Sequence, residues 1–322
     1  MRFLAVALSA LIVLPPAFSQ QEEPTFKTQV SLVNILFSVR DKRGGLIGNL
    51  NKDDFTIFEN GKQQDIKYFT RDTNLPLTIG LLVDVSVSQG RLIQEEQGAA
   101  QGFFSAVLKD KDLAFLISFG PEADLLQDYT NSRKLLAKAL DDLRVSGDAG
   151  GGVFNPGPVP TMSNPKGTIL YDAVYLASDQ ELKGQVGRKA VVLITDGEDQ
   201  GSHYNIAQAI ESAQRADAIV YSIYYVDRGF YASSGGFYHV SDGALRRMSE
   251  ETGGRVFHVD RKHPLTDAFK EIQDEMRSQY AIAYAPTDQK KDGSFRRIEI
   301  RVNNKDYKVQ ARKGYYATET KE

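Results

Sequence analysis

The chain has 322 residues and a formal net charge of −3, with 42 acidic residues against 39 Lys and Arg residues. A length above about 250 residues favours more than one domain. The balanced charge argues against a nucleic-acid binder, which needs a basic patch. The absence of cysteine excludes disulfides, thiolate metal sites, lipid attachment at cysteine and cysteine nucleophiles. With only four histidines, any metal is expected on oxygen ligands, which favours Mg²⁺, Mn²⁺ or Ca²⁺.

Residues 1–19 have the pattern of a secretory signal peptide. Arg2 gives a positive start, residues 3–14 are almost wholly apolar, and residues 17–19 place small side chains at the cleavage positions before Gln20. The alternative is an uncleaved membrane anchor, but the apolar run is shorter than the roughly 20 residues that a spanning helix needs. We therefore expect export to the periplasm or the extracellular space, with no membrane span after cleavage.

Residues 20–74 are predicted to form an N-terminal β region. Apolar and polar residues alternate along residues 30–40, and residues 54–59 form a second short run of this kind. Asn60 and Gly61 predict a two-residue hairpin turn, because both tolerate positive φ. Residues 66–69 are expected to return as the partner strand of this hairpin.

Residues 75–277 are predicted to form an α/β domain. Apolar segments typical of buried strands alternate with segments of helical spacing. The expected strands are 77–83, 113–119, 189–195, 219–226 and 255–259, and the expected helices are 89–108, 131–143, 171–182, 205–216, 244–252 and 265–277. This alternation predicts right-handed βαβ units and a doubly wound, mostly parallel sheet.

Residues 278–322 are predicted to form a C-terminal β region, with strands at 280–284, 295–302 and 307–311. Neither this region nor the N-terminal one has enough strands to bury a core alone. We therefore predict that the two regions pair into one β-sandwich and that the α/β domain is inserted between them.

Three oxygen-bearing side chains, those of Asp84, Ser86 and Ser88, stand where a buried strand is expected to end. Ligands bind at the carboxyl ends of strands in open α/β sheets. A turn with oxygens at alternate positions can direct them toward one hard cation, which needs about six oxygen ligands. The simpler interpretation is that Asp and Ser favour turns and helix N-termini. The triplet alone is therefore a weak signal.

Two further loops strengthen the metal hypothesis. Asp196 follows the buried strand at 189–195, and Thr168 precedes the helix expected at 171–182. Each residue also has a simple structural interpretation, Asp196 in a turn before Gly197 and Thr168 as a helix cap. Three loops that meet at one sheet end are less easily explained in this way, so we expect a site that contains all five side chains.

With these residues in place, the chain resembles the von Willebrand factor A (VWFA) domain family over about residues 75–277. The residues that carry the likeness are Asp84-Val85-Ser86-Val87-Ser88, Gly167-Thr168 and Thr195-Asp196-Gly197, which match the family's metal-ion-dependent adhesion site pattern (MIDAS). The flanks, with residues 54–61 and 295–316, look like the exported VWFA-related subgroup that is abundant in acidobacteria. The chain departs from the commonest pattern at Val87, where Gly is usual, and at Gln89, where Met is frequent. Because Val disfavours positive φ, the turn at Val87 is expected to differ slightly.

The resemblance implies a Mg²⁺ site with one open position for an acidic side chain of a partner protein. By it, Ser86, Ser88 and Thr168 would coordinate through hydroxyls, while Asp84 and Asp196 would act mainly through waters or as anchors. Neutral hydroxyls leave the ion much of its charge, which favours binding a carboxylate over catalysis. Among the histidines, His203 is the best candidate for a general base, but a loop histidine is more often simply exposed.

A loop after the strand at 219–226 leaves the same sheet end and carries a cation and several aromatic residues. Arg228, Phe230, Tyr231, Phe237 and Tyr238 are candidates for a partner-binding surface, because such residues dominate interface hot spots. Alternatively, the aromatic side chains fold onto the domain. Two polar runs, at residues 94–96 and 288–292, are interpreted as solvated surface.

The leading hypothesis is a metal-dependent protein-binding module of the adhesion or scaffold class, and not an enzyme. One alternative is a metal-assisted hydrolase or phosphatase with Asp84 as nucleophile. Phosphatase patterns of that shape need a second Asp where this chain has Ser86, and both a P-loop and a G-x-S-x-G elbow are absent from the sequence. A second alternative is a structural envelope protein with a vacant site.

Overall fold

The structure is a computed structural model that describes residues 32–71, 75–146, 167–233 and 240–318. The signal-peptide segment, Phe237 and Tyr238 therefore lie outside the described residues. Residues 31–322 belong to one compact unit, so the domain boundaries predicted at 74/75 and 277/278 stay predictions. Within the described ranges, no helix is both long enough and apolar enough to cross a bilayer.

A six-stranded sheet forms the centre of the α/β region, in the order β10-β9-β8-β5-β6-β7. Its strands are β5 (Leu77–Asp84), β6 (Leu113–Phe119), β7 (Ala123–Thr130), β8 (Arg188–Thr195), β9 (Ala218–Tyr224) and β10 (Val256–His258). All neighbours are parallel except β6 and β7. The predicted doubly wound, mostly parallel sheet is thus confirmed. The antiparallel edge strand β7 was not predicted, because its side chains are half-buried or exposed without a regular alternation.

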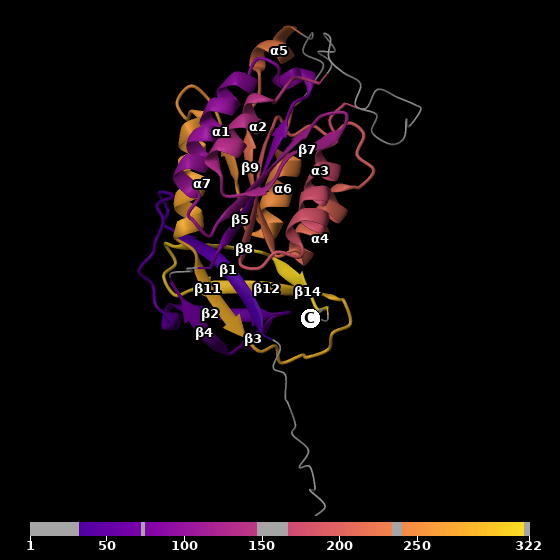
Figure 1. The fold of residues 1–322 in the computed structure, drawn as a ribbon. Helices are drawn as coiled ribbons and strands as arrows, with labels where there is room; N and C mark the ends of the chain where they lie inside the picture. Colours follow the sequence, from indigo (N-terminus) through magenta and orange to yellow (C-terminus); the bar gives the residue numbers. More distant parts are fainter. Residues whose placement is uncertain (1–31, 72–74, 147–166, 234–239, 319–322) are drawn as a thin grey trace, which may run out of the picture. The chain divides into compact units, whose positions relative to one another are not determined.

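Helices cover both faces of this sheet (Figure 1). The buried side chains of α1 (Ile93–Val107), α2 (Arg133–Asp141) and α7 (Leu265–Arg277) belong to one apolar cluster. Those of α3 (Leu170–Leu176), the π-helical turn η3 (Ala177–Leu182), α4 (Ile206–Arg215) and α6 (Gly243–Thr252) belong to a second. A short 3₁₀ turn, η2 (Val87–Gln89), precedes α1.

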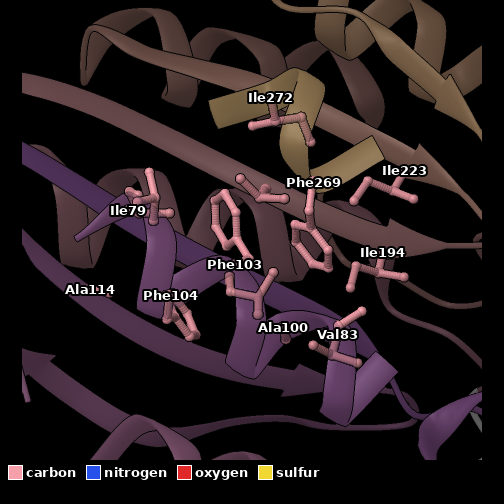
Figure 2. Packing of buried hydrophobic residues seen from close by; sticks show 14 of the residues in the cluster. Ile79, Val83, Ala100, Phe103, Phe104, Ala114, Ile194, Ile223, Phe269 and Ile272 are labelled. Atoms are coloured by element: carbon pink, nitrogen blue, oxygen red, sulfur yellow. The ribbon is translucent and has the colours of Figure 1, made fainter. Parts of the chain in front are cut away.

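Strand β5 separates the two clusters because successive side chains point to opposite faces. Ile79 and Val83 face the cluster of α1 and α7, where the rings of Phe103 and Phe269 stack with centroids 4.6 Å apart (Figure 2). Leu82 faces the other cluster. Every residue of β5 is buried, so the polar group at its end, Asp84, is fixed by a rigid central strand.

Two four-stranded antiparallel sheets complete the fold, in the orders β13-β1-β11-β4 and β14-β12-β2-β3. The N-terminal strands are β1 (Val33–Arg40), β2 (Phe55–Glu59), β3 (Lys62–Gln64) and β4 (Ile66–Thr70), with a 3₁₀ turn η1 (Lys52–Asp54). The C-terminal strands are β11 (Tyr280–Tyr284), β12 (Phe295–Val302), β13 (Lys308–Ala311) and β14 (Gly314–Tyr316). Each sheet combines strands from both ends of the chain, and one apolar cluster joins them, so they form the predicted β-sandwich.

The prediction for residues 66–69 was wrong. The Asn60-Gly61 turn has positive φ at both residues, as expected, but it joins β2 to the short strand β3. Strand β4 instead pairs with β11 in the other sheet. A two-residue turn sets the next residues directly beside β2, and the chain changes sheets after Gln64, whose amide bonds to Thr287.

Glu275 of α7 connects the sandwich to the α/β region. Its buried carboxylate accepts hydrogen bonds from Ser38 and Arg40 of β1, from Gln310 of β13, and from Arg255 beside β10. These donors satisfy both oxygens of the buried carboxylate. Glu275 therefore anchors α7 to strands β1 and β13 of the sandwich.

Candidate metal centre

Asp84 is a buried carboxylate of the candidate site and ends strand β5. Its Oδ1 accepts the Ser86 N–H at 2.9 Å, and its Oδ2 accepts the Thr195 hydroxyl of β8 at 2.6 Å. The carboxylate is completely buried. It therefore fixes the turn after β5 and ties it to the neighbouring strand. Thr195 belongs to the quoted motif, but the sequence did not single it out as a functional side chain.

The hydroxyl groups of Ser86 and Ser88 form consecutive contacts that lead to Asp196. Ser86 Oγ is 3.0 Å from Ser88 Oγ, and Ser88 Oγ donates to Asp196 Oδ2 at 2.7 Å. Asp196 follows β8, and the next residue, Gly197, has a φ of +87° that turns the chain away. The structure thus brings Asp84, Ser86, Ser88 and Asp196 together, although they come from two loops.

Thr168 reaches the same place from a third loop. The carbonyl oxygen of Thr168 accepts the Gln200 N–H at 2.7 Å, and the Gly167 N–H donates back to the Gln200 carbonyl oxygen at 3.1 Å. Ser86, Ser88 and Thr168 all line one cavity of about 480 Å³, together with Glu198 and others. A Cβ on Gly167 would lie 2.5 Å from Gln200 Oε1, so glycine permits this close pairing of loops.

The backbone at Val87 has no positive φ, and whether this turn differs from the commonest form with Gly stays a prediction. Ser86 has an extended backbone, with φ −62° and ψ 161°, and Val87 begins the 3₁₀ turn η2. Val87 is not among the non-glycine residues with positive φ, so this backbone suits a β-branched side chain. Its side chain is 61% exposed beside the cavity.

The site carries an excess of negative charge. Burial and, to a lesser extent, the neighbouring Asp196 raise the pKa of Asp84 to about 7. Burial and Asp196 also raise the pKa of Glu198. In the ranges that the structure describes, neither Asp84 nor Asp196 forms an ion pair with Lys, Arg or His. Such a group of oxygens stabilises a bound cation.

Two buried polar side chains beneath the site were missed. Gln89 and Glu96 are fully buried, and neither the amide of Gln89 nor the carboxylate of Glu96 has a hydrogen-bond partner. The interpretation of residues 94–96 as solvated surface was therefore wrong for Glu96. Gln89, Ile93, Glu96 and Ala100 follow the three- and four-residue spacing of one buried helix face. Gln89 and Glu96 could have been identified from the sequence as polar residues at positions where the spacing predicts an apolar, buried side chain.

The aromatic loop after β9 contains a short helix, α5 (Arg228–Ser233), which was not predicted. The Tyr231 hydroxyl donates to Asp196 Oδ2 at 2.7 Å, so this side chain is directed into the site. Phe230 also lines the cavity, whereas Arg228 is exposed. His203, the candidate general base, has its Nδ1 2.9 Å from Asp172 Oδ2 and does not line the cavity.

These residues fit a hard divalent cation, which prefers oxygen ligands, better than a soft one. The donors that converge are hydroxyl and carboxylate oxygens, which suit Mg²⁺, Mn²⁺ or Ca²⁺. The described chain has no cluster of three or more His, Asp or Glu side chains arranged to hold a metal by themselves. A cation here would therefore depend on the hydroxyls of Ser86, Ser88 and Thr168.

Solved structures similar to this chain include von Willebrand factor A domains. One is a von Willebrand factor type A protein from Catenulispora acidiphila, with 12% identity and a TM-score of 0.48, where the match covers 91% of this chain and 74% of that one. Another is proximal thread matrix protein 1 from the mussel byssus, with 13% identity, a TM-score of 0.49, and 68% and 51% of the two chains covered. A further structure of that mussel protein has a zinc-occupied MIDAS motif.

A third similar structure is BatB from Bacteroides thetaiotaomicron, with 17% identity, a TM-score of 0.43, and 62% of this chain and 97% of that chain covered. No protein-family model and no curated protein matches the chain. These identities and TM-scores are low, and the resemblance to the exported acidobacterial subgroup stays a prediction. What the site does has to be inferred from its own residues.

Proposed function

We propose that this protein is an exported binding module that holds one divalent cation and, through it, a carboxylate of a partner protein. Ser86, Ser88 and Thr168 would supply hydroxyl ligands, with Asp84 and Asp196 beneath or beside them. Mg²⁺ is the expected ion, with Mn²⁺ or Ca²⁺ as substitutes. The observation that carries this proposal is the line of contacts from Ser86 through Ser88 to Asp196, at a sheet end where none of the described cationic side chains pairs with either carboxylate.

Binding is favoured over catalysis by the donor set. Hydroxyl ligands are neutral, so a bound ion keeps much of its attraction for an external carboxylate. The exposed Arg228 at the start of α5 would favour the same kind of partner, one that presents Asp or Glu. Phe237 and Tyr238 remain proposed members of the partner surface. Location in the periplasm or outside the cell is proposed from residues 1–19.

Calorimetric titration of Mg²⁺ and Mn²⁺ into the metal-stripped protein tests the proposal. We expect one equivalent to bind wild type, and Ser88→Ala and Thr168→Ala each to weaken binding by about tenfold or more. Ser222→Ala is the matched control, because Ser222 is a buried serine of the same sheet whose hydroxyl contacts only another serine hydroxyl at 2.9 Å. The control should bind the ion as wild type does.

The alternatives give different results. Absence of binding heat in wild type would favour a structural envelope protein. Turnover of p-nitrophenyl phosphate that requires Mg²⁺ and is lost in Asp84→Asn would favour a metal-assisted hydrolase. Capture of an envelope protein by wild type, abolished both by chelator and by Thr168→Ala, would identify the partner of a metal-dependent binding module.

A further inference from the structure

The base of helix α5 is anchored to α1. Asp227 precedes α5, and its Oδ1 accepts the N–H groups of Gly229 at 2.8 Å and Phe230 at 3.1 Å. Its Oδ2 lies 3.8 Å from Arg91 Nε, and two residues earlier the Tyr225 hydroxyl donates to Glu95 of α1. Tyr225 therefore attaches the chain just before α5 to α1, and Asp227 caps the start of α5.

The other end of α5 is connected to the candidate site by one tyrosine. Asp196 Oδ2 accepts two hydrogen bonds, from Tyr231 Oη and from Ser88 Oγ, both at 2.7 Å. Tyr231 and Phe230 line the same cavity as Ser86, Ser88 and Thr168, and their rings meet edge to face with centroids 5.3 Å apart. The phenol thus stands beside the hydroxyls that are proposed to hold the ion.

The segment between these two attachments is suited to movement. A helix of six residues is marginal by itself, because few of its backbone hydrogen bonds are internal. Gly229 lies between the anchored Asp227 and Tyr231, and a Cβ there would come within 2.8 Å of Arg91 Nη1 and 3.1 Å of Asp227 Oδ1. Glycine therefore allows the close approach to Arg91 and gives the backbone freedom where a hinge would lie.

We propose that residues 227–233 form a lid over the adhesion site and that Tyr231 determines which partners enter, because a partner carboxylate must displace its phenol. This inference rests on the proposed function of the site. The lid opens when the Gly229 and Phe230 N–H groups leave Asp227 and the chain bends at Gly229, while Asp227 keeps its ion pair with Arg91 just before α1. A partner that opens it carries its acidic side chain on a protruding loop or a chain end, since the cavity is bounded by η2 on one side and α5 on another.

Closing of the lid competes with partner binding and lowers the apparent affinity by the fraction of molecules that are open. Tyr231→Phe keeps the ring and removes the hydrogen bond to Asp196. We expect this variant to bind a blocked tripeptide with one central aspartate about three- to tenfold more tightly than wild type at saturating Mg²⁺. The Mg²⁺ dissociation constant itself should stay within about twofold, since the proposed ligands are unchanged.

The control is Tyr204→Phe, which removes the hydroxyl of a 37% exposed tyrosine that stacks on Tyr175. It should bind the tripeptide as wild type does. Weaker tripeptide binding by Tyr231→Phe would overturn the proposal and assign Tyr231 a direct contact with the partner. Weaker Mg²⁺ binding would also overturn it, because Tyr231 would then be a residue that positions Asp196.

Amide hydrogen exchange in the presence of chelator tests the lid without metal. Exchange at residues 228–233 should be faster in Tyr231→Phe than in wild type, while exchange in β5 and β8 is unchanged. Equal exchange in the two proteins would overturn the lid. If wild type bound no Mg²⁺, the proposed function would fail by itself, and the exchange result would still decide whether Tyr231 latches this segment.

Discussion

Two buried carboxylates, one in the β-sandwich and one near the carboxyl end of the central sheet, differ in their hydrogen-bond partners. In the sandwich, Glu59 accepts hydrogen bonds from Tyr284 at 2.7 Å, from Tyr315 at 2.9 Å and from Arg296 at 3.2 Å. At the sheet end, the equally buried Glu96 has no partner for either oxygen.

This difference separates a carboxylate with several hydrogen-bond partners from one without any. Buried polar groups are nearly always paired, because an unpaired one loses its hydration without compensation. Glu59 fulfils that rule with a cation and two phenols. Asp84, Asp196 and Glu96 concentrate acidic groups without a cationic side chain, in the part of the chain that the structure describes. Such an arrangement costs stability and is expected where a cation is to be bound.

Removing the cation of the sandwich pair should have the largest effect. Arg296→Met leaves Glu59 buried without its charge partner and releases the carbonyl oxygens of Asp288 and Lys290, which Arg296 also binds. We expect the free energy of unfolding to fall by about 3–5 kcal/mol. Urea denaturation at constant m-value measures this loss.

The control for that experiment is Arg301→Met on the same strand. Arg301 is exposed and pairs with the exposed Glu299, so its loss should cost no more than about 1 kcal/mol. Similar losses in the two variants would show that the sandwich pair is not a buried structural pair in the sense argued here.

The unbalanced acids at the sheet end should make stability depend on pH. The pKa of Asp84 is raised from 3.8 to about 7. Between these values Asp84 binds more protons in the folded protein than in the unfolded chain, so its contribution to stability is greatest below pH 3.8 and is lost as pH rises through this window. In chelator, Asp84→Asn should flatten a slope that reaches about 1.4 kcal/mol per pH unit for one such group.

Denaturation at pH 5, 6 and 7 measures this slope in wild type and in the variant. Asp124→Asn, at an exposed position of β7, should keep the slope of wild type. A wild-type protein that became more stable from pH 5 to pH 7, with Asp84→Asn following it, would contradict the assignment.

The smallest change in the free energy of unfolding is expected at Glu96, which has no hydrogen-bond partner to lose. Burial is the main cause that raises the pKa of Glu96 well above its ordinary range, with Asp84 contributing in the same direction, and Gln imitates the neutral carboxyl. Glu96→Gln should therefore change the free energy of unfolding by at most about 1 kcal/mol at pH 7, or raise it slightly.

Glu59→Gln provides the contrast, because it leaves the buried Arg296 without its carboxylate and should cost several times more, about 3–5 kcal/mol. The same denaturation assay compares the two variants. If Glu96→Gln were as damaging as Glu59→Gln, Glu96 would have to be a paired structural group.

Local pattern was sufficient for much of the fold. The strands β11 and β12 and the helix α7 begin and end where the sequence predicts, because strong periodicity and clear turn residues bound them. Gly253 ends α6 with φ +98°, as expected for a left-handed stop. Strand β7 and helix α5 were missed because neither has a continuous apolar face, and contacts with neighbouring elements stabilise them instead.

The residues of the candidate site also fall into two groups, those that could be predicted from the sequence and those that could not. Asp84, Ser86, Ser88, Thr168 and Asp196 could be named from the sequence, since each follows or precedes a recognisable buried segment and parallel strands end at one edge of the sheet. The roles of Tyr231, Thr195 and Glu96 could not. Tyr231 and Thr195 bond to residues far away in the chain, and the burial of Glu96 depends on which face of α1 meets the sheet.

The sequence by itself therefore determined most of the strands and helices, the two β regions that pair with each other, and the oxygen-rich loops, because these follow from periodicity, turn chemistry and residue type. Only the tertiary structure decided that β4 crosses to the second sheet, that Glu59 is saturated with donors while Glu96 has none, and that Tyr231 stands over Asp196. Those features depend on which surfaces pack together, and hydrogen-bond partners separated by tens to hundreds of residues are invisible to any local pattern.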